Sequence, residues 1–260
     1  MSGYAPWVRL RHNRSVMSAD LDALYPDIAA EGGLVSALSA VAMKQGLSVP
    51  FTSPEPGSLR SATATSTVSH RNHLTIDAWT VKRRWSITGC ESFQGLALIE
   101  GDTEDPAQIA RAAQAWHDGA ALAEIRRVAT FVKLTGRFEV PDHDAVQLAE
   151  SEWQCLRLEA TEMNLPQYQA MVEAAYHEPA LRRLYPFTSH STLRFAITTR
   201  PNLSVVPVCL DAHQDNRYTV NAEFLGEILA ETSTAQEAVL LAVSQLPPDL
   251  GPVELGVPRS

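Results

Sequence analysis

The 260-residue sequence has little of several features that would narrow its function at once. It has three cysteines, Cys90, Cys155 and Cys209, with no C-x-x-C spacing, so neither a disulfide framework nor a structural zinc site is indicated. No apolar run reaches the roughly eighteen residues needed to cross a bilayer, and the first residues lack the hydrophobic segment of a signal peptide. We therefore expect reduced thiols, no membrane association and a cytoplasmic location.

The sequence also lacks an excess of positive charge. Lysine and arginine number 21 against 30 aspartates and glutamates, a formal net charge of −9, so we do not expect a nucleic-acid partner. A glycine-rich phosphate loop is missing as well, because the glycine pair at 32–33 has neither the spacing nor the Lys-Ser/Thr of a nucleoside triphosphate site. A kinase or NTPase is excluded on this ground, and no cofactor is expected.

What the sequence does contain is a strong pattern of secondary structure. Hydrophobic residues make up 45%, enough for a substantial core. In the first half, hydrophobic spacing, caps and turn residues predict helical segments within 21–45, a loop at 52–67, strands at 74–78, 85–88 and 95–100, and helices at 104–118 and 122–131. The basic run 82–84 separates the first two strands and predicts a hairpin turn.

The second half has a similar order of elements. A polar bridge at 136–150 precedes predicted helices at 153–162 and 165–185, the latter interrupted near Pro179, then strands at 193–199, 203–210 and 218–224 and a helix at 234–246. Ser233 or Thr234 is the expected N-cap of that last helix, with Glu237 placed for a capping box. We predict a first unit at 1–135, a linker at 136–150 and a second unit at 151–260.

Two Ser-His pairs strengthen the comparison of the halves. Ser69-His70 is followed by Cys90, and Ser189-His190 is followed by Cys209 at nearly the same spacing. Each stretch then leads to a capped helix. The predicted fold class is therefore α+β, with two tandem αβββα-type units, antiparallel three-stranded meanders and an internal pseudo-duplication.

The stretch 178–197, EPALRRLYPFTSHSTLRFAI, and the later TAQEAVLLAVSQLP at 234–247 resemble an actinobacterial domain-of-unknown-function family labelled natural-product biosynthesis protein. RRWSITG, ALIEGDTEDPAQIARAAQAWHDG and EIRRVATFV in the first half are also similar to that family. The resemblance covers roughly residues 65–250 and implies a place in secondary metabolism, including the modification of ribosomally made peptides. It brings no catalytic residues.

The richest candidate cluster for chemistry is His190, Asp211 and His213. Pairing of the predicted strands about Pro201 puts Cys209 opposite Thr192 or Leu193, with these three residues gathered beyond it. They could act as a base with an orienting carboxylate or hold a metal, because both jobs need an imidazole nitrogen near a negative partner. The composition of DAHQDN at 211–216 favours a connecting turn instead, and we assign no metal site.

Further candidates have equally plain structural roles. Arg182, Arg183 and Arg194 could form a clamp for an anionic ligand, with Ser189 as a further substrate contact, although arginines at a helix end also stabilise the helix dipole. Thr188 and Ser189 are favoured as backbone caps. His73 is expected near Cys90, which makes an activated thiol conceivable there and at Cys209, but small buried cysteines are the commoner case.

Three functions remain open on the sequence. The leading hypothesis is an accessory or tailoring protein that binds a peptide or small-molecule biosynthetic intermediate in a groove between the units, with other pathway proteins as further candidate partners. Uptake of an extended peptide at a free sheet edge would suit this role. The alternatives are a peptide cyclase that uses the His/Asp cluster and an immunity or chaperone-like module that binds another protein.

Overall fold

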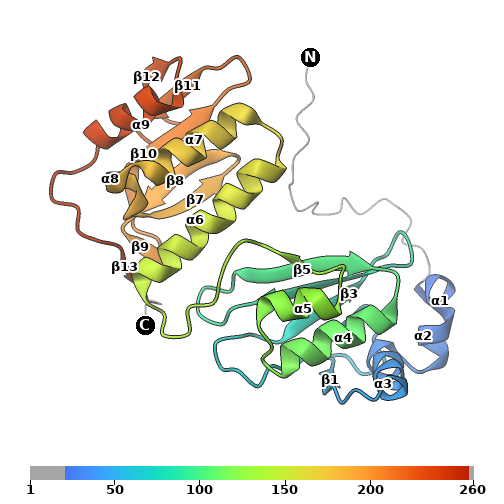
Figure 1. The fold of residues 1–260 in the computed structure, drawn as a ribbon. Helices are drawn as coiled ribbons and strands as arrows, with labels where there is room; N and C mark the ends of the chain where they lie inside the picture. Colours follow the sequence, from blue (N-terminus) through green and yellow to red (C-terminus); the bar gives the residue numbers. More distant parts are fainter. Residues whose placement is uncertain (1–20, 258–260) are drawn as a thin grey trace.

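The computed structural model describes residues 21–257, which form two α+β units joined by an extended segment around 135–144 (Figure 1). The elements of the first unit are α1 (Leu21–Leu24), α2 (Pro26–Ala30), α3 (Leu34–Lys44), β1 (Phe51–Thr52), β2 (Ser61–Ala64), β3 (Leu74–Ala78), β4 (Trp85–Cys90), β5 (Ala97–Thr103), α4 (Pro106–His117), α5 (Leu122–Val128) and β6 (Lys133–Leu134).

The first unit is an antiparallel sheet in the order β1-β2-β3-β4-β5-β6 with helices packed on one face. Side chains of β3 alternate between buried and exposed, as a sheet with one covered face requires. The buried positions face α3 and α4, where Leu38, Ile109 and Trp116 are fully buried. Asp105 caps α4 by accepting a 2.8 Å hydrogen bond from the backbone N–H of Ala107.

The second unit contains α6 (Ala145–Glu162), α7 (Pro166–His177), α8 (Pro179–Arg182), β7 (Tyr185–Ser189), β8 (Thr192–Ala196), β9 (Thr198–Pro201), β10 (Val205–Ala212), β11 (Tyr218–Asn221), β12 (Ile228–Thr232), α9 (Ala235–Ser244) and β13 (Glu254–Gly256). Its main sheet is antiparallel in the order β12-β11-β10-β8-β7, and β13 pairs with β9 in parallel.

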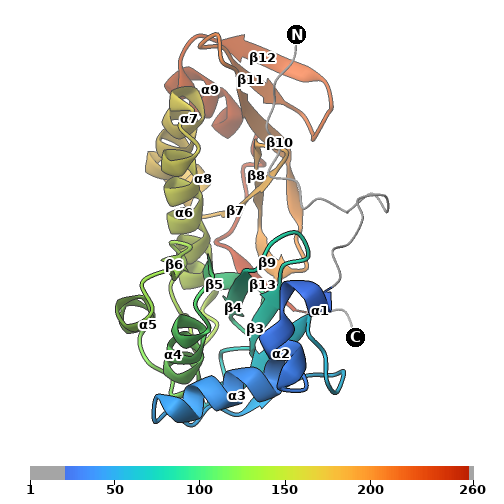
Figure 2. The ribbon, with the colours of Figure 1, turned by 90° about the vertical axis from the view of Figure 1, so that its right-hand side faces the viewer.

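The helices of the second unit cover one face of its main sheet. Leu193, Phe195 and Leu210 point from the strands into a core shared with Trp153 of α6 and Val239 of α9. Figure 2 shows α6 and α7 standing along one side of the sheet, with no helix of the described chain on the other side. We call the other face, which carries no helix of residues 21–257 across its centre, the open face; at its β7 edge Phe187 packs in a small buried cluster with Ala149 of α6.

Several predictions from the sequence are confirmed and others are wrong. The α+β composition and the antiparallel sheets are confirmed. The predicted number of three strands in each sheet is wrong, because the main sheets have six and five strands. Residues 145–152, placed in or beside the linker, belong to α6, which begins eight residues before the predicted start.

The internal duplication is not confirmed. Both units place antiparallel strands between helices, but their sheets differ in strand number and order. His70 lies before β3 and binds Glu139, whereas His190 lies in the turn between β7 and β8.

Within the described chain, no helix has the length and apolar character needed to cross a membrane.

Candidate functional site

The open face of the second sheet gathers most of the candidate residues. Leu193 and Phe195 of β8 point to the helix side, so the residues that alternate with them in the strand point to the other face. The residues of β7, β10 and β11 that lie in register with those residues point to that face as well. The side chains directed to the open face are therefore Phe187, Ser189, Thr192, Arg194, Cys209, Asp211, Thr219 and Asn221, and most of them are buried.

Asp211 is held by the sheet rather than by an imidazole. Its carboxylate accepts one hydrogen bond from the Thr192 hydroxyl and another from the Asn221 side-chain amide at 2.7 Å. The His213 ring lies instead beside the Thr219 hydroxyl, with Nε2 at 3.2 Å. The residues described here include no cluster of three or more groups able to hold a metal ion.

His190 lies in the tight turn between β7 and β8. Its backbone has a φ of 53° and that of Ser191 a φ of 68°, the left-handed region that two-residue hairpin turns require. Its exposed ring stacks on Phe224 with centroids 5.7 Å apart, and the Ser189 hydroxyl lies 3.4 Å from Nδ1. The structure thus brings His190 and His213 to the same end of the sheet but holds each in a separate contact.

Arg194 is the most unusual charged residue on this face. Arg194 is half-buried, and its guanidinium carbon lies 5.0 Å from the ring centroid of Phe187 in β7 and 5.4 Å from that of Phe224 in the segment after β11. Among residues 21–257, no carboxylate oxygen lies within 4.0 Å of its guanidinium nitrogens. Arg137 and Arg157, by contrast, each bind a glutamate through two nitrogens.

A hollow of about 450 Å³ opens beside Arg194, between β10 and the segment 222–224. Its walls are mainly apolar, with Val205, Pro207 and Phe224 among the lining residues, and Glu223 lies exposed at its rim. The hollow follows from the sheet: β11 pairs with β10 only from Cys209 onward, and the register with β8 shifts between Val205 and Cys209. The volume is in the range of small-molecule sites.

Cys209 lies on the floor of this hollow but is not an activated thiol. It is 1% exposed, and its Sγ donates a weak hydrogen bond to the Asn221 carbonyl oxygen at 3.8 Å. Burial, reinforced by the negative charge of Asp211, raises the pKa of the Cys209 thiol to about 11. Burial likewise raises the pKa of Cys155. Cys90 ends β4, where its carbonyl oxygen accepts a hydrogen bond from the backbone N–H of Asn72, the residue before His73.

The other predicted arginines lie apart from Arg194. Arg182 ends α8, where its guanidinium binds Glu150 at 3.2 Å and lies over the Tyr176 ring at 4.4 Å. Arg183 is exposed in the next position. Because α8 packs with α7 on the helix-covered side, the structure does not bring these arginines together with Arg194 into one clamp.

Two aromatic partners of the site were missed by the sequence analysis. Phe187 belongs to β7, which was not predicted because Pro186 was interpreted only as the end of a helix. Phe224 was assigned to a strand, whereas it follows β11 in a loop that folds over the open face. The sequence did contain a signal for β7. Phe187 and Ser189 are two residues apart, as are Thr192 and Arg194 after the turn, and this spacing is typical of two paired strands.

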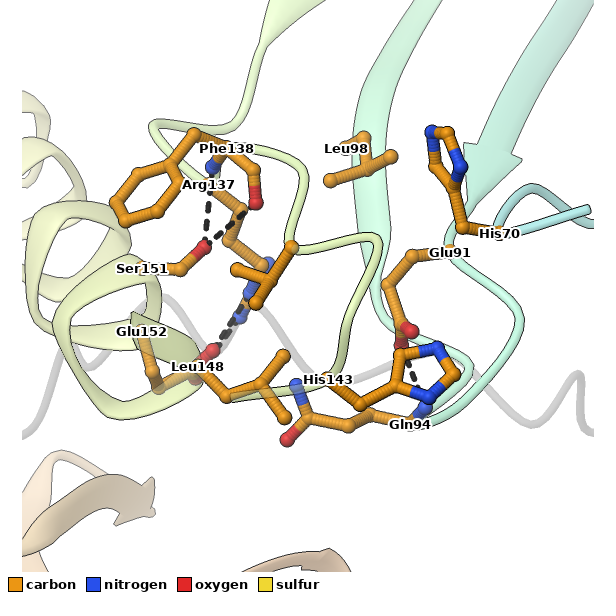
Figure 3. Close-up of a pocket in the computed structure, with 11 residues that line it drawn as sticks. His70, Glu91, Gln94, Leu98, Arg137, Phe138, His143, Leu148, Ser151 and Glu152 are labelled. Carbon is orange, nitrogen blue, oxygen red and sulfur yellow. Dashed lines mark hydrogen bonds and ion pairs between the residues drawn. The ribbon is translucent and has the colours of Figure 1, made fainter. Parts of the chain in front are cut away.

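At the junction between the units, polar contacts join the connecting segment to α6 beside a small hollow (Figure 3). Arg137 makes a two-nitrogen ion pair with Glu152 of α6, and the Ser151 hydroxyl binds the backbone of Phe138. The hollow lined by these residues, His70 and His143 measures about 10 Å³, the space of a single water molecule. An intermediate does not fit in it, so the open face is the better candidate site.

Comparison with known proteins gives a match, which covers the second unit. Residues 147–257 match a protein family described as a family of unknown function (DUF6193). The match spans less than half of the chain and includes the whole main sheet of the second unit. No curated protein and no solved structure gave a significant match.

Proposed function

We propose that this chain is a binding protein of natural-product biosynthesis, which holds a peptide or small-molecule intermediate in the hollow on the open face of the second sheet. The observation that carries the proposal is the apolar hollow of about 450 Å³ with Arg194 in its wall. The sequence resemblance supplies the biosynthetic context. The matched segment 147–257 contains every residue that lines the hollow.

Binding is favoured over catalysis by the state of the candidate catalytic groups. Asp211 is engaged by Thr192 and Asn221, and the two imidazoles contact Phe224 and Thr219 instead of that carboxylate. A cyclase would need a base oriented by its acid, or a thiolate at neutral pH. Cys209 supplies no thiolate because burial raises its pKa.

A protein-binding role, as in an immunity or chaperone-like module, is the second candidate. It is supported by exposed apolar side chains along the loop before β12 and on that edge strand: Leu225 is 88% exposed, Ile228 52% and Leu229 42%. An edge strand without lysine or proline invites pairing with another chain.

The test compares two valine-to-tryptophan variants. Val205→Trp fills the hollow, while Val146→Trp adds the same bulk at an exposed position of α6. Each protein is purified from cells that express the neighbouring biosynthetic genes, and bound molecules are measured by native mass spectrometry. We expect a bound small molecule or peptide on the natural chain and on Val146→Trp, and its loss on Val205→Trp.

Three other results would count against the proposal. Retention of the bound molecule by Val205→Trp would place the site elsewhere, and recovery of a stoichiometric protein alone would favour the protein-binding role. In the reconstituted pathway, His190→Ala and His213→Ala should leave product formation at its normal rate. A large loss of rate in folded variants that still bind the intermediate would establish the catalytic alternative.

A further inference from the structure

We infer that Arg194 binds a carboxylate, and that the hollow therefore selects ligands in which one carboxylate is attached to an apolar group. This inference rests on the proposed function, because it names the chemistry of the ligand for the same hollow. It starts from a charge that the described chain leaves without an acidic partner.

A half-buried cation without a counter-ion is costly to keep. Loss of water around a guanidinium is normally offset by a carboxylate, as Glu173 offsets it for Arg157. At Arg194 the rings of Phe187 and Phe224 offset only part of it, through cation–π contacts. A ligand carboxylate at the nitrogen edge would complete the site, since guanidinium and carboxylate match in a two-point geometry.

The surroundings of Arg194 favour a single carboxylate over a phosphate or other polyanion. Glu223 lines the rim of the hollow, and Asp211 occupies the same sheet face. Both carboxylates add negative potential, and the whole chain carries a formal charge of −9. A ligand with two or more negative charges would meet this repulsion with only one arginine to offset it.

The apolar walls of the hollow determine that the rest of the ligand is apolar. Val205, Val208 and Pro207 line it, and Phe224 closes over it from the loop after β11. Burial of aliphatic groups against these walls supplies affinity, while the carboxylate fixes orientation. The carboxylate can come from the C-terminus of an apolar peptide or from a free organic acid, and both sources meet the same site.

The test uses three probes of defined chemistry: the N-acetylated tripeptide Leu-Val-Leu with a free carboxylate, the same tripeptide as its C-terminal amide, and octanoate. Calorimetry on the full chain should give at least tenfold tighter binding of the free acid than of the amide. Arg194→Gln should remove this preference, while Arg183→Gln, which deletes an exposed arginine from the helix-covered side, should keep it.

The outcomes separate this inference from the proposed function. If the acid and the amide bind equally well and Val205→Trp binds neither, the hollow is the binding site but the inferred contact between Arg194 and a carboxylate is wrong. The inference also fails if the acid preference survives in Arg194→Gln, or if neither octanoate nor the peptide acid binds the natural chain. Tight octanoate without peptide binding would support the shared chemistry and assign the free acid as its source.

A second variant protects the test against loss of folding. If Arg194→Gln does not fold, Arg194→Lys keeps the charge but loses the planar, two-point geometry. We then expect the ratio of acid to amide affinity to fall below that of the natural chain. An unchanged ratio would show that the guanidinium does not contact the carboxylate.

Discussion

Individual side chains on the open face have settled hydrogen-bond partners, and this limits the chemistry they can do. Both carboxylate oxygens of Asp211 accept hydrogen bonds from side chains of neighbouring strands, and the Cys209 thiol donates to a carbonyl oxygen of β11. Arg194 is different, because its side-chain contacts within residues 21–257 are with two ring faces, which leaves its donors for a ligand. Recognition at this face therefore depends on one arginine more than on the His/Asp cluster.

The state of Cys209 gives a prediction at the residue scale. With a pKa of about 11 and 1% exposure, roughly one thiol in a thousand is ionised at pH 8, and the sulfur is shielded as well. We expect iodoacetamide to label Cys209 slowly in the folded protein and rapidly in concentrated urea, as followed by peptide mass spectrometry. Labelling should quicken as the pH rises toward 11, because the thiolate fraction grows.

Cys155 provides the matched comparison for this experiment, since it is also fully buried and burial raises its pKa too. Both thiols should react slowly in the folded chain, and Cys155 no faster than Cys209, because burial raises its pKa further. If Cys209 alone reacted in the folded protein as fast as in urea, its thiol would be accessible and ionised, and the catalytic alternative would regain support.

At the scale of elements, prediction from sequence worked where local signals agree. The helices α4 and α9 were predicted near their true bounds because each combines an N-cap with apolar residues at helical spacing. Strands β3 and β4 were predicted because they alternate and flank a basic turn. In the second unit, β10 was predicted to put Cys209 beside Thr192 or Leu193, and its partner is Arg194.

The missed elements lacked such signals. Strand β2 is Ser-Ala-Thr-Ala in a stretch rich in serine and threonine, so only its pairing with β3 defines it. Strand β7 contains Pro186, which is accepted because β7 lies at the edge of the main sheet. The one-residue error at Cys209 comes from the irregular register between Val205 and Cys209, which no local pattern announces.

The start of α9 supplies a prediction at this scale. The sequence left Ser233 and Thr234 as alternative N-caps, and the Thr234 hydroxyl accepts the Glu237 N–H at 3.2 Å. Thr234→Ala should lower the free energy of unfolding by about 1 kcal/mol, because it leaves that N–H without its cap. Ser233→Ala should change it by less than about 0.5 kcal/mol. Urea denaturation measures both, and equal losses would contradict the assignment.

At the scale of the whole molecule, each unit has its own hydrophobic core. One cluster of buried residues spans Tyr25 to Val132, and the others lie between Ala149 and Val253. The units meet through polar contacts: Arg71 of the first unit binds Glu139 in the connecting segment, and Arg137 binds Glu152 of α6. The predicted division at 1–135 and 151–260 stays a prediction.

The connecting segment is pressed against α6, and this fixes how the units are joined. Gly136 has a φ of 88°, and an added Cβ would lie 2.9 Å from the Gln154 carbonyl oxygen, so glycine is needed for the close approach. This close approach places the next residue, Arg137, within hydrogen-bond distance of Glu152. Its Nη1 also donates to the Ala97 carbonyl oxygen of β5 at 3.3 Å. One guanidinium thus ties β5 of the first unit to α6 of the second.

Breaking this tie tests whether the ion pair holds the molecule together. Burial alone would lower the pKa of Arg137, but the hydrogen bond and charge of Glu152 outweigh it and hold that pKa above its ordinary value. Glu152→Gln leaves a charge that is 14% exposed without its partner, and should cost about 3–5 kcal/mol in urea denaturation. Glu124→Gln, in the exposed pair with Arg127, should have no measurable effect.

The double variant Arg137→Met with Glu152→Leu decides the cause of that loss. If the unpaired charge is what destabilises Glu152→Gln, removing both charges should recover most of the lost stability, because apolar residues can replace a buried pair at little cost. A double variant as unstable as the single one would mean that the packing of α6 against the connecting segment, and not the ion pair, joins the two units.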